Sequence, residues 1–379
     1  MTAAGAPVIV VVGAGLGGLT LAAVLARHGV EVVVLDRDAG PSARTQGGML
    51  DMHEESGQAA LRAAGLEDAS RAAVLPGGEA LRVLDREGRV LHEEDDDGEG
   101  GRPEIRRETL RELLLGALAP GTVRWGSGVT SARPLGGGRH AVEVGAGEPL
   151  VADLLVGADG AWSRVRPLVS DAVPVYSGVT FAAARLHDAD ARHPGPAEAV
   201  GGGLLFALGD RRGVIAHREP GATIEVYAAV RTDDPAGLER ALADGTLPAA
   251  FDGWAPELRA LVTEVDEPFA VRPIHALPVG HAWEHREGMT LIGDAAHLMS
   301  PFAGEGANLA MQDGAELAAA LLEQGVATAA GRERALATYE AAMVPRAAQA
   351  AAESAANLDL CFGPDGATAL RDVFLAHRA

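Results

Sequence analysis

The sequence predicts an α/β fold in which one domain is built on a parallel sheet and a second domain on an antiparallel sheet, followed by a C-terminal helix. The β-branched run Val8 to Val12 leads through glycines into a helical pattern, as is typical of a strand buried on both faces of a parallel sheet. The same order of strand and glycine loop returns in MTLIGDAAH at 289–297. Between them, residues 175–267 hold short apolar segments separated by turns, which indicates an antiparallel sheet.

The first segment predicts one complete β-α-β unit of the Rossmann-like kind. LTLAAVLARH at 19–28 predicts a helix that ends at Gly29, and VEVVVLDRD at 30–38 predicts the returning strand. The later expected elements are helices at 54–64, 109–118 and 310–323, a hairpin at 81–94, and strands at 122–126, 140–145 and 151–157. Helical segments are expected from 331 onward, with Pro345 kinking or interrupting the last long helix.

These patterns divide the chain into three parts. We expect the parallel-sheet domain at 1–74, 102–174 and 268–330, and the antiparallel-sheet domain at 75–101 and 175–267. Residues 331–379 then form a C-terminal helical segment.

Composition excludes several classes of function. The 379 residues are 47% hydrophobic and 22% charged, which indicates a globular chain, and a formal net charge of -21 argues against a nucleic acid or an anionic membrane surface as partner. All 32 basic residues are arginine, so a Schiff-base enzyme and a P-loop kinase, which both need lysine, are excluded. The single cysteine, Cys361, permits no internal disulfide, and no signal peptide or membrane-spanning stretch is found, so we expect a cytoplasmic protein.

The glycine loop GAGLGG matches the dinucleotide-binding pattern GxGxxG between a strand and a helix. Gly13 allows the tight turn, Gly15 lets the backbone approach a pyrophosphate, and Gly18 lets the helix that opens at Leu16 press on the sheet. Asp36 closes the second strand, where a carboxylate accepts hydrogen bonds from an adenosine ribose. The alternative is that the glycines serve close packing only. The pattern fits NAD(P) and FAD equally.

A second candidate ligand-binding segment, GDAAHLMSPFAGEGAN at 293–308, favours FAD over NAD(P). A predicted strand delivers Asp294 at its carboxyl end, and a glycine-containing loop then opens another helix near the ligand edge of the sheet. A nicotinamide dehydrogenase needs no second binding segment of this kind. FAD is a longer molecule that needs contacts along its whole length, so we expect the two glycine loops to hold one FAD.

Together with LLVGADGAWSRVR at 154–166, these motifs resemble the three FAD motifs of the class A flavoprotein monooxygenases, the aromatic hydroxylase type. The resemblance covers nearly the whole chain. Within that group, ARTQGGMLDMHEESGQAALRAAGL at 43–66 and PEIRRETLRELLL at 103–115 are most similar to the tetracycline-inactivating monooxygenases. The resemblance implies that the parallel-sheet domain binds FAD and that the antiparallel-sheet domain binds the substrate.

The resemblance also implies roles for single residues. Asp36, with Arg37 beside it, holds the adenosine ribose, Arg107 contacts FAD, and Asp294 binds the ribityl or pyrophosphate region. Asp51 matches a flavin-contacting aspartate, although it could instead serve a local turn or cap. Arg44 matches an arginine linked to NADPH, although it could equally be a surface arginine.

The two later motifs carry further expectations. By the resemblance Asp159 lies near both FAD and NAD(P)H; Arg164 and Arg166 either attract phosphates of the reduced cofactor or pair with surrounding acids. Backbone amides of the loop and helix start are expected to face the flavin pyrimidine edge, where the reduced flavin carries negative charge. The residues of that set are Pro301, Gly304, Glu305, Gly306, Ala307 and Asn308. For His297 we expect a structural hydrogen bond.

The implied reaction is flavin oxygenation of a small molecule. NADPH or NADH reduces FAD, O2 adds to give a C4a-hydroperoxyflavin, and one oxygen passes to the substrate. No catalytic side chain and no metal site are expected. The alternatives are a flavin-dependent dehydrogenase or reductase without oxygen insertion, and a non-catalytic FAD-binding protein.

The substrate wall is expected in the antiparallel-sheet domain. Positions where tetracycline-oxidising enzymes place polar side chains fall at Ala184, Leu204 and around Ile224 or Glu225, so a more apolar substrate is expected, an aromatic or polyketide-like intermediate of secondary metabolism. The expected contacts are Ala184, Leu204, Phe206, Ile215, His217, Tyr227 and Phe302. A monomer or weak homodimer is expected.

Overall fold

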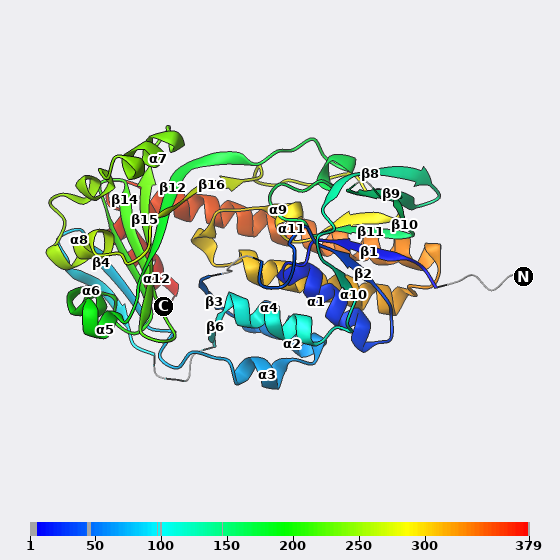
Figure 1. The fold of residues 1–379 in the computed structure, drawn as a ribbon, viewed down its shortest axis with the longest axis horizontal. Coiled ribbons are helices and arrows are strands. Elements are labelled where there is room, and N and C mark those ends of the chain that lie inside the picture. Colours follow the sequence, from blue (N-terminus) through cyan, green and yellow to red (C-terminus); the bar gives the residue numbers. More distant parts are fainter. Residues whose placement is uncertain (1–5, 44–46, 97, 99–100, 146, 378–379) are drawn as a thin grey trace, which may run out of the picture.

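The computed structural model describes residues 6–43, 47–96, 98, 101–145 and 147–377. Its first domain is built on five parallel strands in the order β17-β11-β1-β2-β7 (Figure 1). These strands are β1 (Ile9–Val12), β2 (Val33–Leu35), β7 (Val123–Arg124), β11 (Leu154–Gly157) and β17 (Met289–Leu291). The neighbouring strands β17, β11 and β1 are buried along their whole length, because their apolar side chains pack on both faces of the sheet.

Helices from both ends of the sequence cover this sheet (Figure 1). They are α1 (Leu16–Arg27), α2 (Ala59–Ala64), α3 (Glu67–Arg71), α4 (Arg107–Gly116), α10 (Gly306–Gln324) and α11 (Ala329–Cys361). The crossing of α1 and α10 is close because glycines form it: a Cβ on Gly17 would lie 2.6 Å from the carbonyl oxygen of Ala310, and one on Gly314 would lie 2.4 Å from that of Gly17. The first and last thirds of the chain therefore share one core.

The second sheet has seven strands in the order β16-β12-β15-β14-β13-β4-β5. It is antiparallel except for the parallel pair β13 and β4. Its strands are β4 (Leu81–Asp85), β5 (Val90–Glu94), β12 (Val175–Leu186), β13 (Leu204–Gly209), β14 (Arg212–Glu219), β15 (Thr223–Arg231) and β16 (Ala270–Ala276).

The two faces of this sheet pack against different helices. One face lies under α7 (Pro235–Ala243) and α8 (Pro256–Thr263), beside α5 (Ala189–Arg192), α6 (Pro194–Val200) and the short η3 (Leu247–Phe251). The other face packs against the end of α11 and against α12 (Gly366–His377). Because side chains alternate along each strand, every position belongs to one of the two faces.

Smaller elements complete the first domain. A three-stranded antiparallel sheet joins β8 (Val129–Gly136), β9 (Arg139–Val144) and β10 (Leu150–Ala152), and β3 (Met49–Asp51) pairs with β6 (Glu104–Arg106). The single-turn elements are η1 (Glu54–Gln58), η2 (Arg166–Leu168), α9 (Asp294–His297) and η4 (Pro301–Ala303). None of the helices that the structure describes combines the length and apolar character needed to cross a bilayer.

The predicted fold class is confirmed, and four details differ. The strand expected at 151–157 is two strands, β10 and β11, which belong to different sheets, and β8 was not predicted. Pro345 does not interrupt α11, which continues for 33 residues. A proline removes one backbone donor, and side chains buried on both sides of it, such as Tyr339 and Ala347, hold the helix together.

Residues 270–276 pair within the second sheet as β16, although they fall inside the range 268–330 expected for the first domain.

Candidate functional site

The three glycine-containing motifs meet at one edge of the parallel sheet. They follow β1, β11 and β17, which are adjacent in the sheet, and the carboxyl ends of parallel strands lie at the same edge. Residues 13 and 158 are in direct contact there, since a Cβ on Gly13 would lie 2.2 Å from the carbonyl oxygen of Ala158. Segments far apart in the sequence therefore form a single candidate site (Figure 1).

The glycines of the first loop have separate roles. Gly13 has a φ of +111°, and its N–H donates to the carbonyl of Leu35. Gly18 packs so closely that a Cβ there would lie 2.2 Å from the carbonyl oxygen of Gly13, so these two glycines serve the turn and the packing. Gly15 differs, because a Cβ there would meet no protein atom within 4 Å. The space in front of Gly15, at the start of α1, is open to a ligand.

Asp36 lies beside this loop and is buried. Its Oδ2 accepts from the N–H of Ala14 at 2.7 Å and its Oδ1 from the N–H of Asp38 at 2.8 Å. Each carboxylate oxygen retains a second lone pair for a ribose hydroxyl. Arg37 is exposed.

Arg111 is a buried arginine of this region that sequence reasoning missed. Its Nε donates to the carbonyl of Ala14 at 3.2 Å, and its guanidinium lies 5.2 Å from the centroid of the Trp125 ring. It therefore braces the glycine loop from α4. A signal existed in the sequence, because Arg111 follows Arg107 by four residues and shares the buried stripe of α4 with Leu110 and Leu114.

Asp313 holds the start of the segment 293–308 in place, and sequence reasoning missed it as well. It is fully buried in α10, and its Oδ2 accepts from the N–H of Gly293 at 2.9 Å and lies 2.6 Å from His297 Nε2. Its Oδ1 accepts from Arg346 at 3.0 Å. Burial alone would lower the pKa of His297, but the charge of Asp313 and the hydrogen bond to it outweigh burial and raise that pKa. His297 thus makes the structural hydrogen bond expected of it.

Asp294 and Arg107 lie close enough for their charges to interact. Asp294 keeps accessible surface, yet desolvation by the surrounding protein raises its pKa, with His297 and Arg107 opposing the shift. Burial lowers the pKa of Arg107, and the charges of Asp294 and Tyr227 oppose that shift. Neither side chain has a hydrogen-bond partner among the described residues. Both are therefore available to a ligand in a partly desolvated position.

The loop before α10 lies next to β3. Pro301 and Gly304 are exposed, Gly304 has a φ of +68°, and a Cβ on Gly306 would meet nothing within 4 Å. Ala307 and Asn308 are buried. A Cβ on Gly304 would lie 3.5 Å from Asp51 Oδ2, so the expected flavin contacts at 51 and 304 are neighbours.

Asn308 uses its side chain to hold the two segments together. Its amide Nδ2 donates to the carbonyl of Asp51 at 2.8 Å, and its Oδ1 accepts from the N–H of His53 at 3.1 Å. The side chain is therefore a structural tie, and only the backbone of this position can face a flavin.

The middle motif is held by its own side chains. Asp159 accepts from Ser163 Oγ at 2.5 Å and from the N–H of Arg164 at 2.6 Å, so its carboxylate closes the loop. Arg166 is buried and donates to the carbonyls of Ala295 and Ala161. Its hydrogen-bond partners within the protein are therefore backbone carbonyls rather than acids. Arg164 is exposed.

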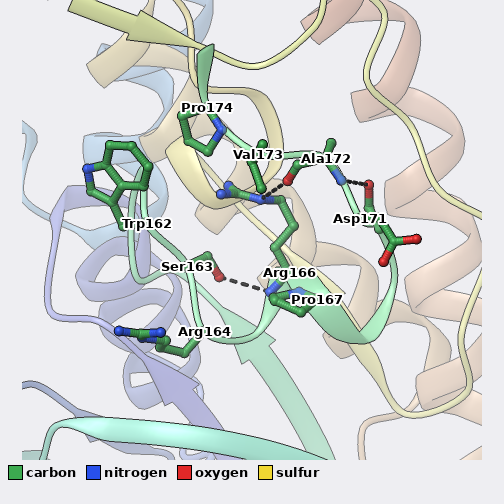
Figure 2. A pocket seen from close by; sticks show the side chains of 10 residues that line it. Trp162, Ser163, Arg164, Arg166, Pro167, Asp171, Ala172, Val173 and Pro174 are labelled. Atoms are coloured by element: carbon green, nitrogen blue, oxygen red, sulfur yellow. Dashed lines mark hydrogen bonds between the residues drawn. The ribbon is translucent and has the colours of Figure 1, made fainter. Parts of the chain in front are cut away.

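A hollow of about 510 Å³ lies on the outer side of this motif (Figure 2). Figure 2 shows Arg166 among its lining residues, bonded to Ala172, with the ring of Trp162 standing to one side. Trp162 is 62% exposed and packs edge-on against His275 at 5.3 Å between centroids. The lining contains neither the first glycine loop nor residues 293–308.

Five of the expected substrate contacts lie in one apolar cluster on the sheet face that packs against α11 and α12. They are Leu204, Phe206, Ile215, Tyr227 and Phe302. Phe302 lies in the loop 301–305 before α10, which we call the flavin loop because contacts to the flavin are expected there. Its ring lies 6.1 Å from that of Phe181 on β12 and 5.4 Å from that of Phe362. The cluster therefore links the flavin loop to the second sheet.

The expectation for Ala184 is corrected. Ala184 lies opposite Val226 in the ladder, and Val226 and Leu186 belong to the core under α7 and α8. Its side chain therefore points away from Phe181 and Tyr227, because neighbouring positions on a strand alternate between faces. The physical reason is a shift of one residue in the assumed register.

The sheet face that carries the expected substrate contacts is also more polar than expected. Glu225, rather than Ile224, shares the face of Tyr227, and its Oε2 lies 3.7 Å from Arg185. Burial and the neighbouring Glu219 raise the pKa of Glu225. His217 is satisfied by Glu104 at 3.3 Å and by the carbonyl of Arg218 at 2.8 Å, so it connects the second sheet to β6.

Two further points concern Arg44 and metal binding. Arg44 lies outside the described residues. Within the part of the chain that the structure describes, no group of His, Cys, Asp or Glu side chains is arranged to hold a metal ion.

Residues 6–354 match the family described as FAD binding domain. The chain belongs to this family of class A flavin monooxygenases. Monooxygenase asqM of Emericella nidulans is 30% identical, with 93% of this chain and 95% of its own covered. Monooxygenase penA of Penicillium thymicola is 31% identical, with 96% and 98% covered. The protein is therefore a flavoprotein monooxygenase.

Solved structures support the fold of the monooxygenase. Klebsiella pneumoniae HpxO, solved with FAD and uric acid, has a TM-score of 0.78 at 21% identity over 98% of this chain and 92% of that one. The tetracycline destructase Tet(51) has a TM-score of 0.73 at 20% identity over 98% and 96%. The resemblance to the tetracycline-inactivating enzymes is thus confirmed, and at this identity it concerns the fold alone.

Proposed function

We propose that this monooxygenase uses NADPH or NADH and O2 to oxygenate a small aromatic or polyketide-like molecule. Per turnover, NAD(P)H, a proton, O2 and the substrate give NAD(P)⁺, water and the oxygenated product. Bound FAD supplies the electron transfer and oxygen activation of this reaction. The observation that carries the proposal is the meeting of three motif loops, with open space at Gly15 and a partnerless carboxylate at Asp294, at one sheet edge.

The residues at this edge fit FAD. Asp36 offers lone pairs to the adenosine ribose, the start of α1 at Gly15 and Leu16 offers its amides to the pyrophosphate, and Asp294 takes the ribityl region. Arg107 lies close enough to Asp294 to balance its charge. The backbone of 305–308 offers N–H groups toward the flavin, where they would stabilise negative charge on the reduced ring.

For the substrate we propose a largely apolar body that lies along Phe206, Ile215, Tyr227 and Phe302. The polar side chains at Glu225 and Arg185 lie on the same face and would receive a hydrogen-bonding substituent of the ring system. We place the reduced nicotinamide cofactor near the middle motif, where Arg164 is exposed. The protein acts as a monomer or weak homodimer and, with its one cysteine buried, in the cytoplasm.

Three measurements on the purified protein test this proposal. The protein should bind FAD, NADPH or NADH should bleach the bound flavin without oxygen, and labelled O2 should enter the product of an aromatic or polyketide substrate library. Flavin reduction with no label in any product would instead indicate a dehydrogenase or reductase. Bound FAD that no nicotinamide cofactor reduces would indicate a non-catalytic flavin protein.

A further inference from the structure

His53 lies between two carboxylates next to the flavin loop. It is 3% exposed; its Nε2 lies 2.9 Å from Asp51 Oδ2 and its Nδ1 lies 3.4 Å from Glu305 Oε1. Only the doubly protonated ring can donate to both acids at once. The contact joins β3 to the loop before α10, the same two segments that Asn308 ties together.

The charged surroundings of His53 are few. Asp51 and Glu305 contact it, and Arg102, which is largely exposed, lies 3.8 Å from Asp51. Burial alone would lower the pKa of His53, but the two acids outweigh burial and raise it from 6.5 to about 9. The ring is therefore a cation at neutral pH, and the group formed by Asp51, His53 and Glu305 carries one net negative charge.

We propose that His53, as a buried imidazolium, is a positioning residue that fixes Asp51 and the loop 304–308 against FAD. This inference rests on the proposed place of FAD beside that loop. Without the imidazolium, two carboxylates face each other with no cation between them, and the loop moves to separate them. Their uncompensated charge also opposes the negative charge that a flavin gains on reduction.

The first experiment compares His53→Gln with His193→Gln. His193 is a matched control because it is buried and bridges Glu264 and Asp266 at 3.1 Å each, in the α5–α6 region far from the flavin loop (Figure 1). For His53→Gln we expect FAD to bind about tenfold more weakly. We also expect reduced FAD to lose a further tenfold, which lowers the flavin potential by about 30 mV. His193→Gln should change neither value.

Two results would overturn the inference: unchanged FAD affinity and potential in His53→Gln, or equal changes in His193→Gln. Adding Glu305→Gln to His53→Gln should recover part of the lost affinity, because it removes one of the opposed charges. No recovery would also count against the inference.

The wild-type protein gives a test that needs no variant. In the folded protein the pKa of His53 is raised to about 9, so its contribution to FAD binding is complete well below pH 9 and is lost as the pH rises through that value. FAD affinity should follow that course, and a flat profile through pH 9 would contradict the inference. If the wild type binds no FAD at any pH, the proposed function fails first. If it binds FAD with a flat profile, only the role of His53 fails.

Discussion

Asp313 illustrates how single buried residues hold the site. It contacts no expected ligand, yet it fixes Gly293, His297 and Arg346 at once. A buried carboxylate of this kind is stable only while its partners compensate its charge. Local sequence did not reveal it, because Asp313 lies within an alanine-rich helix and its partners come from two other segments.

Replacing Asp313 with asparagine should therefore destabilise the protein. The variant keeps the size of the side chain but removes the buried charge that pairs with His297 and Arg346, of which only Arg346 keeps another acid among the described residues, Glu316 at 2.8 Å. We expect a loss of roughly 3 kcal/mol in the free energy of unfolding. Urea unfolding measures it. Asp68→Asn is the control, since Asp68 is exposed and pairs with Arg71 at the surface, where a loss below about 1 kcal/mol is expected. Equal losses in the two variants would refute the role given to Asp313.

At the scale of elements, the crossing of α1 and α10 determines how the two ends of the chain meet. The crossing depends on residues without side chains, because Gly17 and Gly314 let the two backbones approach. Periodicity predicted both helices but not their contact, since Gly17 occupies a variable position of the dinucleotide pattern and its partner Gly314 lies almost 300 residues away. The segment at 151–157 shows a similar limit: a single residue, Asp153, separates β10 from β11, and the two strands pair with different partners.

Because of this close crossing, we expect Gly17→Ala to lower the free energy of unfolding, although alanine usually raises it when it replaces a glycine in a helix. Alanine in a helix normally stabilises by about 1 kcal/mol relative to glycine, but here its Cβ would lie 2.6 Å from the carbonyl oxygen of Ala310. We expect a net loss of about 1–3 kcal/mol from overpacking, measured by denaturant unfolding. The control is Gly116→Ala at the end of α4, where a Cβ meets nothing within 4 Å. It should be neutral or stabilising, and a similar gain at Gly17 would show that the crossing is loose.

At the scale of the whole molecule, the candidate FAD site draws on segments from the first glycine loop to α10. A ligand that binds such a site stabilises the native state as a whole, because unfolding of either end destroys the site. The second sheet joins the same unit through Phe302 and through the contact of His217 with Glu104.

Removing FAD should therefore lower global stability. At a free FAD concentration of one hundred times Kd, the loss is about 2.7 kcal/mol. In Gly15→Val the new side chain would occupy the open space in front of Gly15. This variant should unfold like the FAD-free wild type and should gain nothing when FAD is added, as thermal unfolding with and without FAD would show. A full FAD-dependent gain in Gly15→Val would mean that the cofactor does not approach that residue.

The sequence by itself determined the fold class, the family and the cofactor, because glycine turns and strand-end carboxylates are local patterns that chemistry restricts to few residue types. Only the tertiary structure decided which residues support those patterns. Asp313 and His53 have partners far away in the chain, at Arg346 and Glu305, and no local spacing identifies them. The tertiary structure also decided the strand face of each expected substrate contact: a shift of one residue turns a side chain to the other side of a strand, so Ala184 lies on the opposite face from Tyr227 and Glu225 lies on the same face.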